Sequence, residues 1–155
     1  MHRILFVCTG NTCRSPMAEA YLKSRSIPGI EVKSAGVSAV NGGGATPNVK
    51  QVLEEYQINH NHQSTFLTQK EVNWATHILT MTSGHKEAVI SYFPGAEQKT
   101  FTLNEFAHNK VGFDIADPFG GSVDTYRATF AEIKEAIEKI IIKLEKENKE
   151  VPGGK

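Results

Sequence analysis

The sequence has little of what marks secreted, membrane-spanning or nucleic-acid-binding proteins. Its 155 residues include only two cysteines, and seventeen Lys and Arg balance seventeen Asp and Glu. A chain with no net charge and no basic cluster is not expected to bind nucleic acid. The longest early apolar run, residues 4–8, is much shorter than a signal-peptide core or a membrane span. We therefore expect a cytoplasmic protein that does not contact membranes.

The two cysteines, Cys8 and Cys13, are five positions apart. A disulfide between them would close too small a loop to stabilise a fold, so the chain has no disulfide framework. In a reducing compartment they are better explained as reactive thiols.

The segment that follows the first apolar run is the most informative. Five residues separate Cys8 from Arg14, and Ser15-Pro16 then opens a helix. Inward backbone N–H groups, a helix N-terminus and a guanidinium together form a cradle for a tetrahedral oxyanion such as phosphate, and they also favour the nucleophilic thiolate. The spacing alone can arise by chance from a buried cysteine and an unrelated arginine, but its context favours a phosphate-binding loop. We assign this loop to Thr9, Gly10, Asn11, Thr12, Cys13, Arg14 and Ser15, with Cys8 at its base.

Three loop residues have expected roles of their own. Gly10 allows the backbone to approach a ligand closely or to adopt a positive φ. The side chain of Asn11 is expected to hydrogen-bond neighbouring groups and hold the loop open. The Ser15 hydroxyl is expected to reach the Cys8 sulfur and stabilise its thiolate.

Short apolar runs alternate with helical periodicity along the chain, which predicts an α/β fold. We expect strands at 4–7, 30–34, 77–81 and 99–103, and helices at 17–23, 47–56, 86–93 and 123–144. Strands separated by helices form a parallel sheet. The prediction is one doubly wound domain over residues 1–150, with a four-stranded parallel sheet, helices on both faces and the phosphate-binding loop after the first strand. Residues 151–155 are predicted to be a flexible tail.

A proton donor is expected in the loop before the last helix. Proline biases Asp117 of Asp117-Pro118 toward an extended backbone, which can present its carboxyl group across a cleft. The alternative is that this segment is only a turn, with Asp114 or Asp124 capping a helix.

Three segments resemble the low-molecular-weight protein tyrosine phosphatase family: residues 7–16, Ser34-Ala35-Gly36 and Asp117-Pro118. The similarity spans essentially the whole chain. It implies that Cys8 is the nucleophile, that Arg14 clamps the phosphate and that Asp117 is the general acid and then the base. It further implies a supporting hydrogen-bond network of Asn11, Ser15 and Ser34, and a reversible disulfide between Cys13 and the nucleophile.

At two positions this chain departs from the tyrosine-specific members of the family. At both it is similar to the bacterial branch that dephosphorylates phosphoarginine in proteins. Many tyrosine-specific members have a bulky aliphatic residue where this chain has Thr12, and aromatic residues where it has Phe119-Gly120-Gly121. A slender, polar phosphoguanidinium suits a hydroxyl and a carboxylate, whereas a phenyl ring needs apolar walls. We therefore predict a protein-arginine phosphatase, with Thr12 and Phe119 as selectivity residues. The alternative is a tyrosine phosphatase in which Thr12 is neutral variation.

The reaction implied by the resemblance uses no cofactor and no metal, and it acts on phosphorylated proteins through a phosphocysteine. We expect a monomer, although the sequence leaves the oligomeric state open. An arsenate reductase on this architecture would need a relay of further cysteines, and none follows Cys13. A phosphate or redox sensor without catalysis would not need Asp117. His60-Asn-His62 resembles a metal-binding pair, but we interpret it as a polar loop because no further ligand is nearby in the sequence.

Overall fold

The structure is a computed structural model that describes residues 1–109 and 114–150. The predicted tail, 151–155, lies outside the described residues. The elements follow one another in the order β1 (His2–Cys8), α1 (Arg14–Ser24), β2 (Ile30–Gly36), α2 (Pro47–Glu55), α3 (Gln69–Trp74), β3 (His77–Thr80), α4 (Ser83–Tyr92), the 3₁₀ helix η1 (Pro94–Lys99), β4 (Thr100–Thr102), α5 (Leu103–His108) and α6 (Val123–Glu150).

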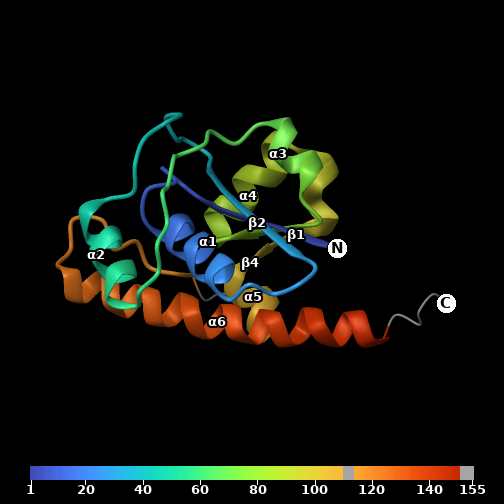
Figure 1. Ribbon diagram of the computed structural model, residues 1–155. Coiled ribbons are helices and arrows are strands. Elements are labelled where there is room, and N and C mark those ends of the chain that lie inside the picture. Colours follow the sequence, from blue (N-terminus) through green and yellow to red (C-terminus); the bar gives the residue numbers. More distant parts are fainter. Residues whose placement is uncertain (110–113, 151–155) are drawn as a thin grey trace.

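The strands form one parallel sheet in the order β2-β1-β3-β4 (Figure 1). Cys8 at the end of β1 pairs with Gly36 of β2, and Val7 pairs with Thr80 of β3. β1 is therefore an inner strand. The chain goes from β1 to β2 on one side of it and later to β3 on its other side, so the strand order reverses at β1. In such sheets ligands bind beyond the carboxyl ends of the strands at this switch point, where the loop after β1 begins.

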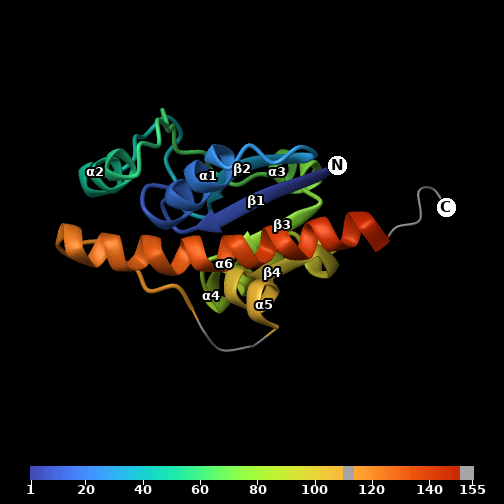
Figure 2. The ribbon, with the colours of Figure 1, turned by 60° about the horizontal axis from the view of Figure 1, so that its bottom comes forward.

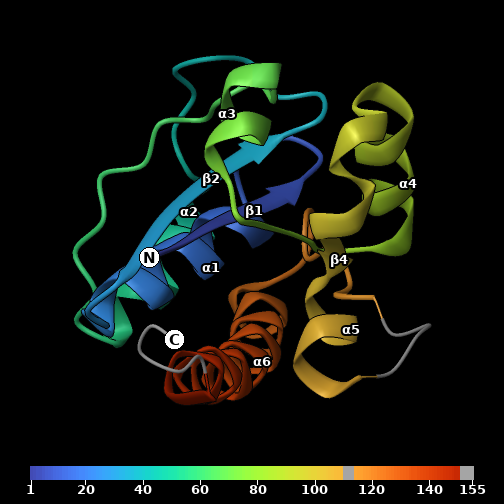
Figure 3. The same cartoon turned by 90° about the vertical axis from the view of Figure 1, so that its right-hand side faces the viewer.

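Helices cover both faces of the sheet, as the alternation of strands and helices predicts (Figure 3). Ile4 and Phe6 of β1 point into a core shared with α1, α2, α5 and α6. Leu5 and Val7 point to the opposite face and join a smaller core with α3 and α4. The sequence of a strand that is buried on both faces is a continuous run of apolar residues, and residues 4–7 have this pattern.

The long helix α6 packs against α1, α2 and α5 and runs the length of the domain (Figure 2). Its apolar residues recur at three- and four-residue steps, so they form one stripe that faces the core. The buried members of this stripe are Tyr126, Phe130, Ile133, Ala136, Ile137, Ile140, Ile141 and Leu144. The predicted apolar face of the last helix is confirmed.

All four predicted strands and four predicted helices are present, with their ends shifted. Two short helices, α3 and α5, were not predicted. Each has six residues and begins with a capping box, Thr68 with Glu71 and Thr102 with Glu105. The Thr-x-x-Glu spacing is a recognised helix-start signal, whereas six residues are too few to show a periodicity. Tyr56, predicted on the second helix, lies just beyond α2 and is 45 % exposed.

Within the part of the chain that the structure describes, no helix combines the length and the apolar character needed to cross a membrane.

The apolar stripe of α6 leads to a prediction about stability. The same helix also offers a matched control. Ile137 is fully buried, whereas Ile142 is 64 % exposed. Both substitutions by Ala remove the same atoms and change helix propensity equally. We expect Ile137→Ala to lower the free energy of unfolding by about 2–5 kcal/mol, because it leaves a cavity. Ile142→Ala should change it by no more than about 0.5 kcal/mol. Urea denaturation of both variants measures the difference, and equal losses would contradict the assigned face.

Candidate active site

The loop from Cys8 to Arg14 connects β1 to α1 and lines a pocket of about 230 Å³. The pocket is lined by Cys8, Thr9, Gly10, Thr12, Cys13, Arg14, Asp117 and Phe119. The structure therefore brings together the predicted nucleophile, clamp and acid, although more than one hundred residues separate the acid from the other two.

Asn11 is the turning point of this loop. Its φ is 57°, in the left-handed region, whereas Gly10 is not among the residues with a positive φ. The sequence offered Gly10 for a positive φ, and the structure uses Asn11 instead, which tolerates this region better than most residues do. The Asn11 backbone carbonyl accepts hydrogen bonds from His62 Nε2 at 2.6 Å and Ser64 Oγ at 2.8 Å. The backbone N–H of Thr65 donates to Asn11 Oδ1 at 2.8 Å.

The orientation of the Asn11 amide sets the direction of the hydrogen bonds around Cys8. Because Oδ1 accepts from a backbone N–H, Nδ2 must be the group that faces Ser15 Oγ at 2.7 Å and Ser34 Oγ at 2.9 Å. Each serine oxygen accepts one of these bonds and keeps its own proton to donate. The Ser15 hydroxyl lies 2.8 Å from Cys8 Sγ, so it can donate to the thiolate.

Position 36, in the Ser34-Ala35-Gly36 segment, requires glycine because the backbone of the loop after β1 approaches it closely. A Cβ atom on Gly36 would lie 2.5 Å from the carbonyl oxygen of Thr9 and 2.9 Å from the backbone nitrogen of Asn11. The backbone N–H groups of Val37 and Ser38 donate to the carbonyls of Cys8 and Thr9 at 3.0 and 2.9 Å. The end of β2 and the two residues after it therefore hold the start of the loop in place.

Arg14 and Asp117 lie close together in the lining of the pocket. The Arg14 side chain is almost fully buried, and one of its terminal nitrogens donates to the carbonyl of Ile115 at 2.7 Å. The other lies 3.8 Å from Asp117 Oδ2, and the Asp117 side chain is 56 % exposed. The backbone N–H of Phe119 donates to Asp117 Oδ1, so this aspartate also forms the turn that the alternative interpretation predicted. Asp114, the other candidate cap, accepts from the backbone N–H of Ser83 at the start of α4.

Cys13 and the two predicted selectivity residues lie around the pocket. Cys13 is a buried free thiol whose sulfur lies 3.6 Å from the hydroxyl of Tyr126 and 3.8 Å from those of Thr12 and Thr46. Thr12 is partly exposed, and the Phe119 ring is 73 % exposed at the rim. Both residues line the pocket.

His85 is a site residue that the sequence analysis did not predict. Its Nε2 lies 2.7 Å from the Thr9 hydroxyl, while Nδ1 has no hydrogen-bond partner among the described residues. Burial, reinforced by the positive charge of Arg14, lowers the pKa of His85 to about 4 against the opposing charges of Asp114 and Asp117. The imidazole is therefore neutral at pH 7. No sequence motif marks it, because Thr9 and His85 are brought together only by the packing of α4.

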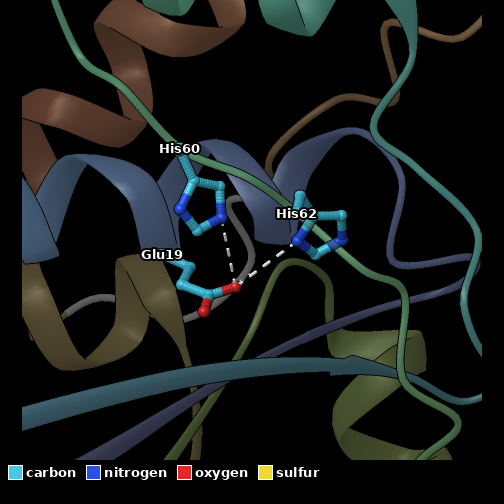
Figure 4. A group of neighbouring side chains, drawn as sticks. All are labelled: Glu19, His60 and His62. Carbon is cyan, nitrogen blue, oxygen red and sulfur yellow. Dashed lines mark ion pairs between the residues drawn. The ribbon is translucent and has the colours of Figure 1, made fainter.

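Behind the loop lies a second unpredicted group, Glu19 of α1 with His60 and His62 (Figure 4). His60 Nε2 and His62 Nδ1 lie 3.7 and 3.6 Å from the same Glu19 oxygen. Burial raises the pKa of Glu19, but contacts with His60, His62, Lys23 and Ser34 outweigh it and hold that pKa well below its usual range. His60 and His62 do lie on a loop, as interpreted, but the expectation that no further ligand is nearby is wrong, because α1 supplies a carboxylate.

A thiol that faces a helix N-terminus and a buried guanidinium is the arrangement of cysteine-dependent phosphatases, in which sulfur attacks phosphorus. Comparison with known proteins identifies the group within this class. The model of the family described as low molecular weight phosphotyrosine protein phosphatase matches residues 3–150. The chain belongs to this family.

Among curated relatives, the chain is 51 % identical over 146 residues to a protein-arginine-phosphatase of Geobacillus stearothermophilus, covering 94 % of this chain and 98 % of that protein. It is 38 % identical over 138 residues to the low molecular weight protein-tyrosine-phosphatase PtpB of Staphylococcus haemolyticus, covering 89 % and 96 %.

Among solved structures, the YwlE arginine phosphatase from Geobacillus stearothermophilus superimposes with a TM-score of 0.96 at 50 % identity, covering 98 % of each chain. A YwlE arginine phosphatase mutant with a phosphorylated active site serine gives a TM-score of 0.90 at 44 % identity, covering 93 % of this chain and 96 % of that one.

The lowered pKa of His85 predicts a specific pH dependence of stability. The folded pKa of about 4 lies below the ordinary value of 6.5, so the unfolded chain binds more protons and stability is lost as pH falls below about 6.5. We expect this histidine to account for about 2 kcal/mol of the stability lost between pH 7 and pH 5. His85→Gln, which keeps a polar group beside Thr9, should reduce the loss by that amount. Urea denaturation at both pH values measures it.

His108→Gln, at the end of α5, controls for removing a histidine elsewhere. It should show the same loss between pH 7 and pH 5 as the unmodified protein. An unchanged loss in His85→Gln would show that His85 does not titrate in this way.

Proposed function

We propose that this protein is a protein-arginine phosphatase that works through a phosphocysteine intermediate. The observation that carries the proposal is that Thr12 and Asp117, whose side chains both carry oxygen atoms, line the same cavity as Cys8. The likeness to protein-arginine phosphatases in both sequence and structure supports it.

In the first step, the Cys8 thiolate attacks phosphorus in line with the bond to the leaving nitrogen. Arg14 and the N–H groups at the start of α1 bind the equatorial phosphoryl oxygens, where the charge is spread in the transition state. Asp117 donates its proton to the nitrogen as the phosphorus–nitrogen bond breaks, and arginine leaves in its guanidinium form. A new sulfur–phosphorus bond remains on Cys8.

In the second step, water attacks the phosphocysteine while Asp117, now a carboxylate, accepts a proton from that water. The sulfur leaves as a thiolate, and the Ser15 hydroxyl 2.8 Å away stabilises it. Inorganic phosphate is then released and the starting state is restored. The related structure with a phosphorylated active site serine supports a covalent intermediate in this family.

Substrate selectivity depends on which polar and apolar side chains line the pocket. A phosphoguanidinium carries N–H groups that need acceptors, and Thr12 and Asp117, which both line the pocket, carry oxygen atoms that can accept. A phenyl ring would gain nothing from these acceptors and would leave them unpaired. Among the described residues, the exposed Phe119 is the one large apolar side chain that lines the pocket, and we assign it to contact with the substrate's aliphatic stem.

Tyrosine phosphatase activity is the alternative, favoured by the family's name and by the relationship to PtpB. It needs the same Cys8, Arg14 and Asp117 but no acceptor at Thr12. The two candidates therefore differ in the role of one hydroxyl.

The remaining assignments belong to the same proposal. Cys13 acts as the partner of Cys8 in a reversible disulfide, for which a sulfenic acid on the nucleophile is the precursor. Phosphorylated proteins are the substrates, the chain acts as a monomer, and the cytoplasm supplies the reducing conditions that keep both thiols free.

The role of Asp117 as general acid predicts a dependence on the leaving group. Asp117→Asn keeps the shape of the side chain and removes its proton, so kcat should fall about a hundredfold or more. The loss should shrink for artificial aryl phosphates with very acidic leaving groups, because these need no protonation. Steady-state kinetics across a series of aryl phosphates checks this. Equal losses throughout the series would remove Asp117 from the acid role.

The role of Thr12 predicts a change in the ratio of two substrates. The unmodified protein should have a higher kcat/KM for a phosphoarginine peptide than for the matched phosphotyrosine peptide. Thr12→Ile removes the acceptor and adds apolar bulk, and it should lower that ratio about ten- to a hundredfold while phosphotyrosine turnover holds or rises. Thr12→Ser, which keeps the hydroxyl, is the matched control and should retain the ratio. A preference for phosphotyrosine in the unmodified protein would make it an ordinary tyrosine phosphatase.

A further inference from the structure

Three side chains behind the phosphate-binding loop converge on one point outside the pocket. Glu19 projects from α1, and His60 and His62 project from the loop between α2 and α3 toward the same carboxylate oxygen (Figure 4). One ligand atom from each lies within 4.8 Å of the other two. The His60 side chain is 10 % exposed and that of His62 is 3 % exposed. His60 Nε2 has no hydrogen-bond partner among the described residues.

The tautomer of His62 is set by the phosphate-binding loop. His62 Nε2 lies 2.6 Å from the backbone carbonyl of Asn11, which can only accept, so Nε2 carries a proton. In the neutral imidazole, Nδ1 is then a bare lone pair, and it points at the Glu19 carboxylate from 3.6 Å. Two electron-rich atoms that face each other in a buried site require a positive charge between them, either a proton on Nδ1, which then donates to Glu19, or a metal ion.

We propose that Glu19, His60 and His62 form a binding site for a zinc ion, with Glu19 Oε1, His60 Nε2 and His62 Nδ1 as ligands. Zinc binds nitrogen and oxygen ligands tetrahedrally at about 2.0–2.2 Å, which places ligand atoms about 3.4 Å apart. The two separations from Glu19 Oε1 are 3.7 and 3.6 Å, and all three ligand atoms lie within 4.8 Å of one another, so side-chain movements of about 1 Å bring them to the metal.

The surroundings of the three ligands favour coordination. Histidines that bind zinc usually donate their other N–H to a carbonyl, as His62 does to Asn11, and carboxylate ligands are themselves hydrogen-bonded. Lys23 holds the second Glu19 oxygen at 2.8 Å, and Ser34 donates to Oε1. Three protein ligands leave a fourth position, and this side of the cluster opens into a cleft of about 330 Å³ that can admit water.

Zinc at this position would stabilise the phosphate-binding loop without touching the substrate. Its ligand His62 is bound to the Asn11 carbonyl, and its ligand Glu19 accepts from Ser34, which in turn accepts from the Asn11 amide. The site is independent of the proposed reaction, which uses no metal.

The decisive experiment is a titration of the unmodified, reduced protein with zinc, followed by long-range proton–nitrogen NMR of its histidine rings. We expect Nε2 of His60 and Nδ1 of His62 to move to the chemical shifts of metal-bound nitrogen at one zinc per chain, while Nε2 of His62 stays protonated. If neither nitrogen moves while zinc binds elsewhere, or if no binding saturates below millimolar zinc, the proposal is overturned. This readout needs no substitution and therefore does not depend on the folding of a variant.

Affinity measurements test the same site by substitution. The thiols also bind zinc, so calorimetry is performed in a Cys8→Ser, Cys13→Ser background, where His60→Asn should weaken binding about a hundredfold or more. His108→Asn, which removes a histidine far from the cluster, is the matched control and should change the affinity less than twofold. Equal affinities of the His60→Asn and His108→Asn proteins would contradict the assignment.

Discussion

Asn11 adopts a backbone conformation with φ of 57°, and the shape of the phosphate-binding loop depends on its staying there. Left-handed backbone costs a residue with a side chain about 1–3 kcal/mol unless its surroundings compensate. Five hydrogen bonds do so, two donated by the side-chain amide, one accepted by it and two accepted by the backbone carbonyl. The same bonds orient Ser15 toward Cys8. One residue therefore shapes the loop and directs the Ser15 proton toward Cys8.

The loop also depends on partners that are distant in the sequence. β2 supplies Ser34 and the glycine whose missing side chain lets the loop backbone approach, and the segment before α3 supplies His62 and Ser64. These segments meet because β1 is an inner strand of a parallel sheet. A thiol at the carboxyl end of such a strand is surrounded by loops on several sides, so a short motif can be held rigidly.

In the proposed reaction, the pocket separates the shared chemistry from the choice of substrate. Cys8 and the almost fully buried Arg14 act on the phosphoryl group, which both candidate substrates share. Thr12, Asp117 and Phe119 line the same pocket, and the proposal assigns them to the group attached to phosphorus. On this proposal a change of substrate needs only a few residues to change, because these touch the leaving group and not the phosphoryl oxygens.

Local patterns in the sequence determined much of this protein. The apolar run at 4–7, the Cys-to-Arg spacing, the Ser-Pro helix start and the periodicity of the last helix depend on neighbours within one turn or strand, and the structure has each of them. The prediction that Ser15 reaches Cys8 also depended only on residues close together in the sequence, and the structure has this contact. The short helices α3 and α5 were missed because six residues are too few to show a period.

Only the tertiary structure decided which distant side chains meet. It placed Asp117 opposite Arg14, set His85 against Thr9, and put the positive φ on Asn11 instead of Gly10. It also turned an unremarkable His60-Asn-His62 segment and a helical Glu19 into a buried cluster. The physical reason is that a hydrogen bond or an ion pair between residues dozens of positions apart leaves no periodicity in the sequence. Such contacts form only when the packing of helices on the sheet brings the two groups within bonding distance.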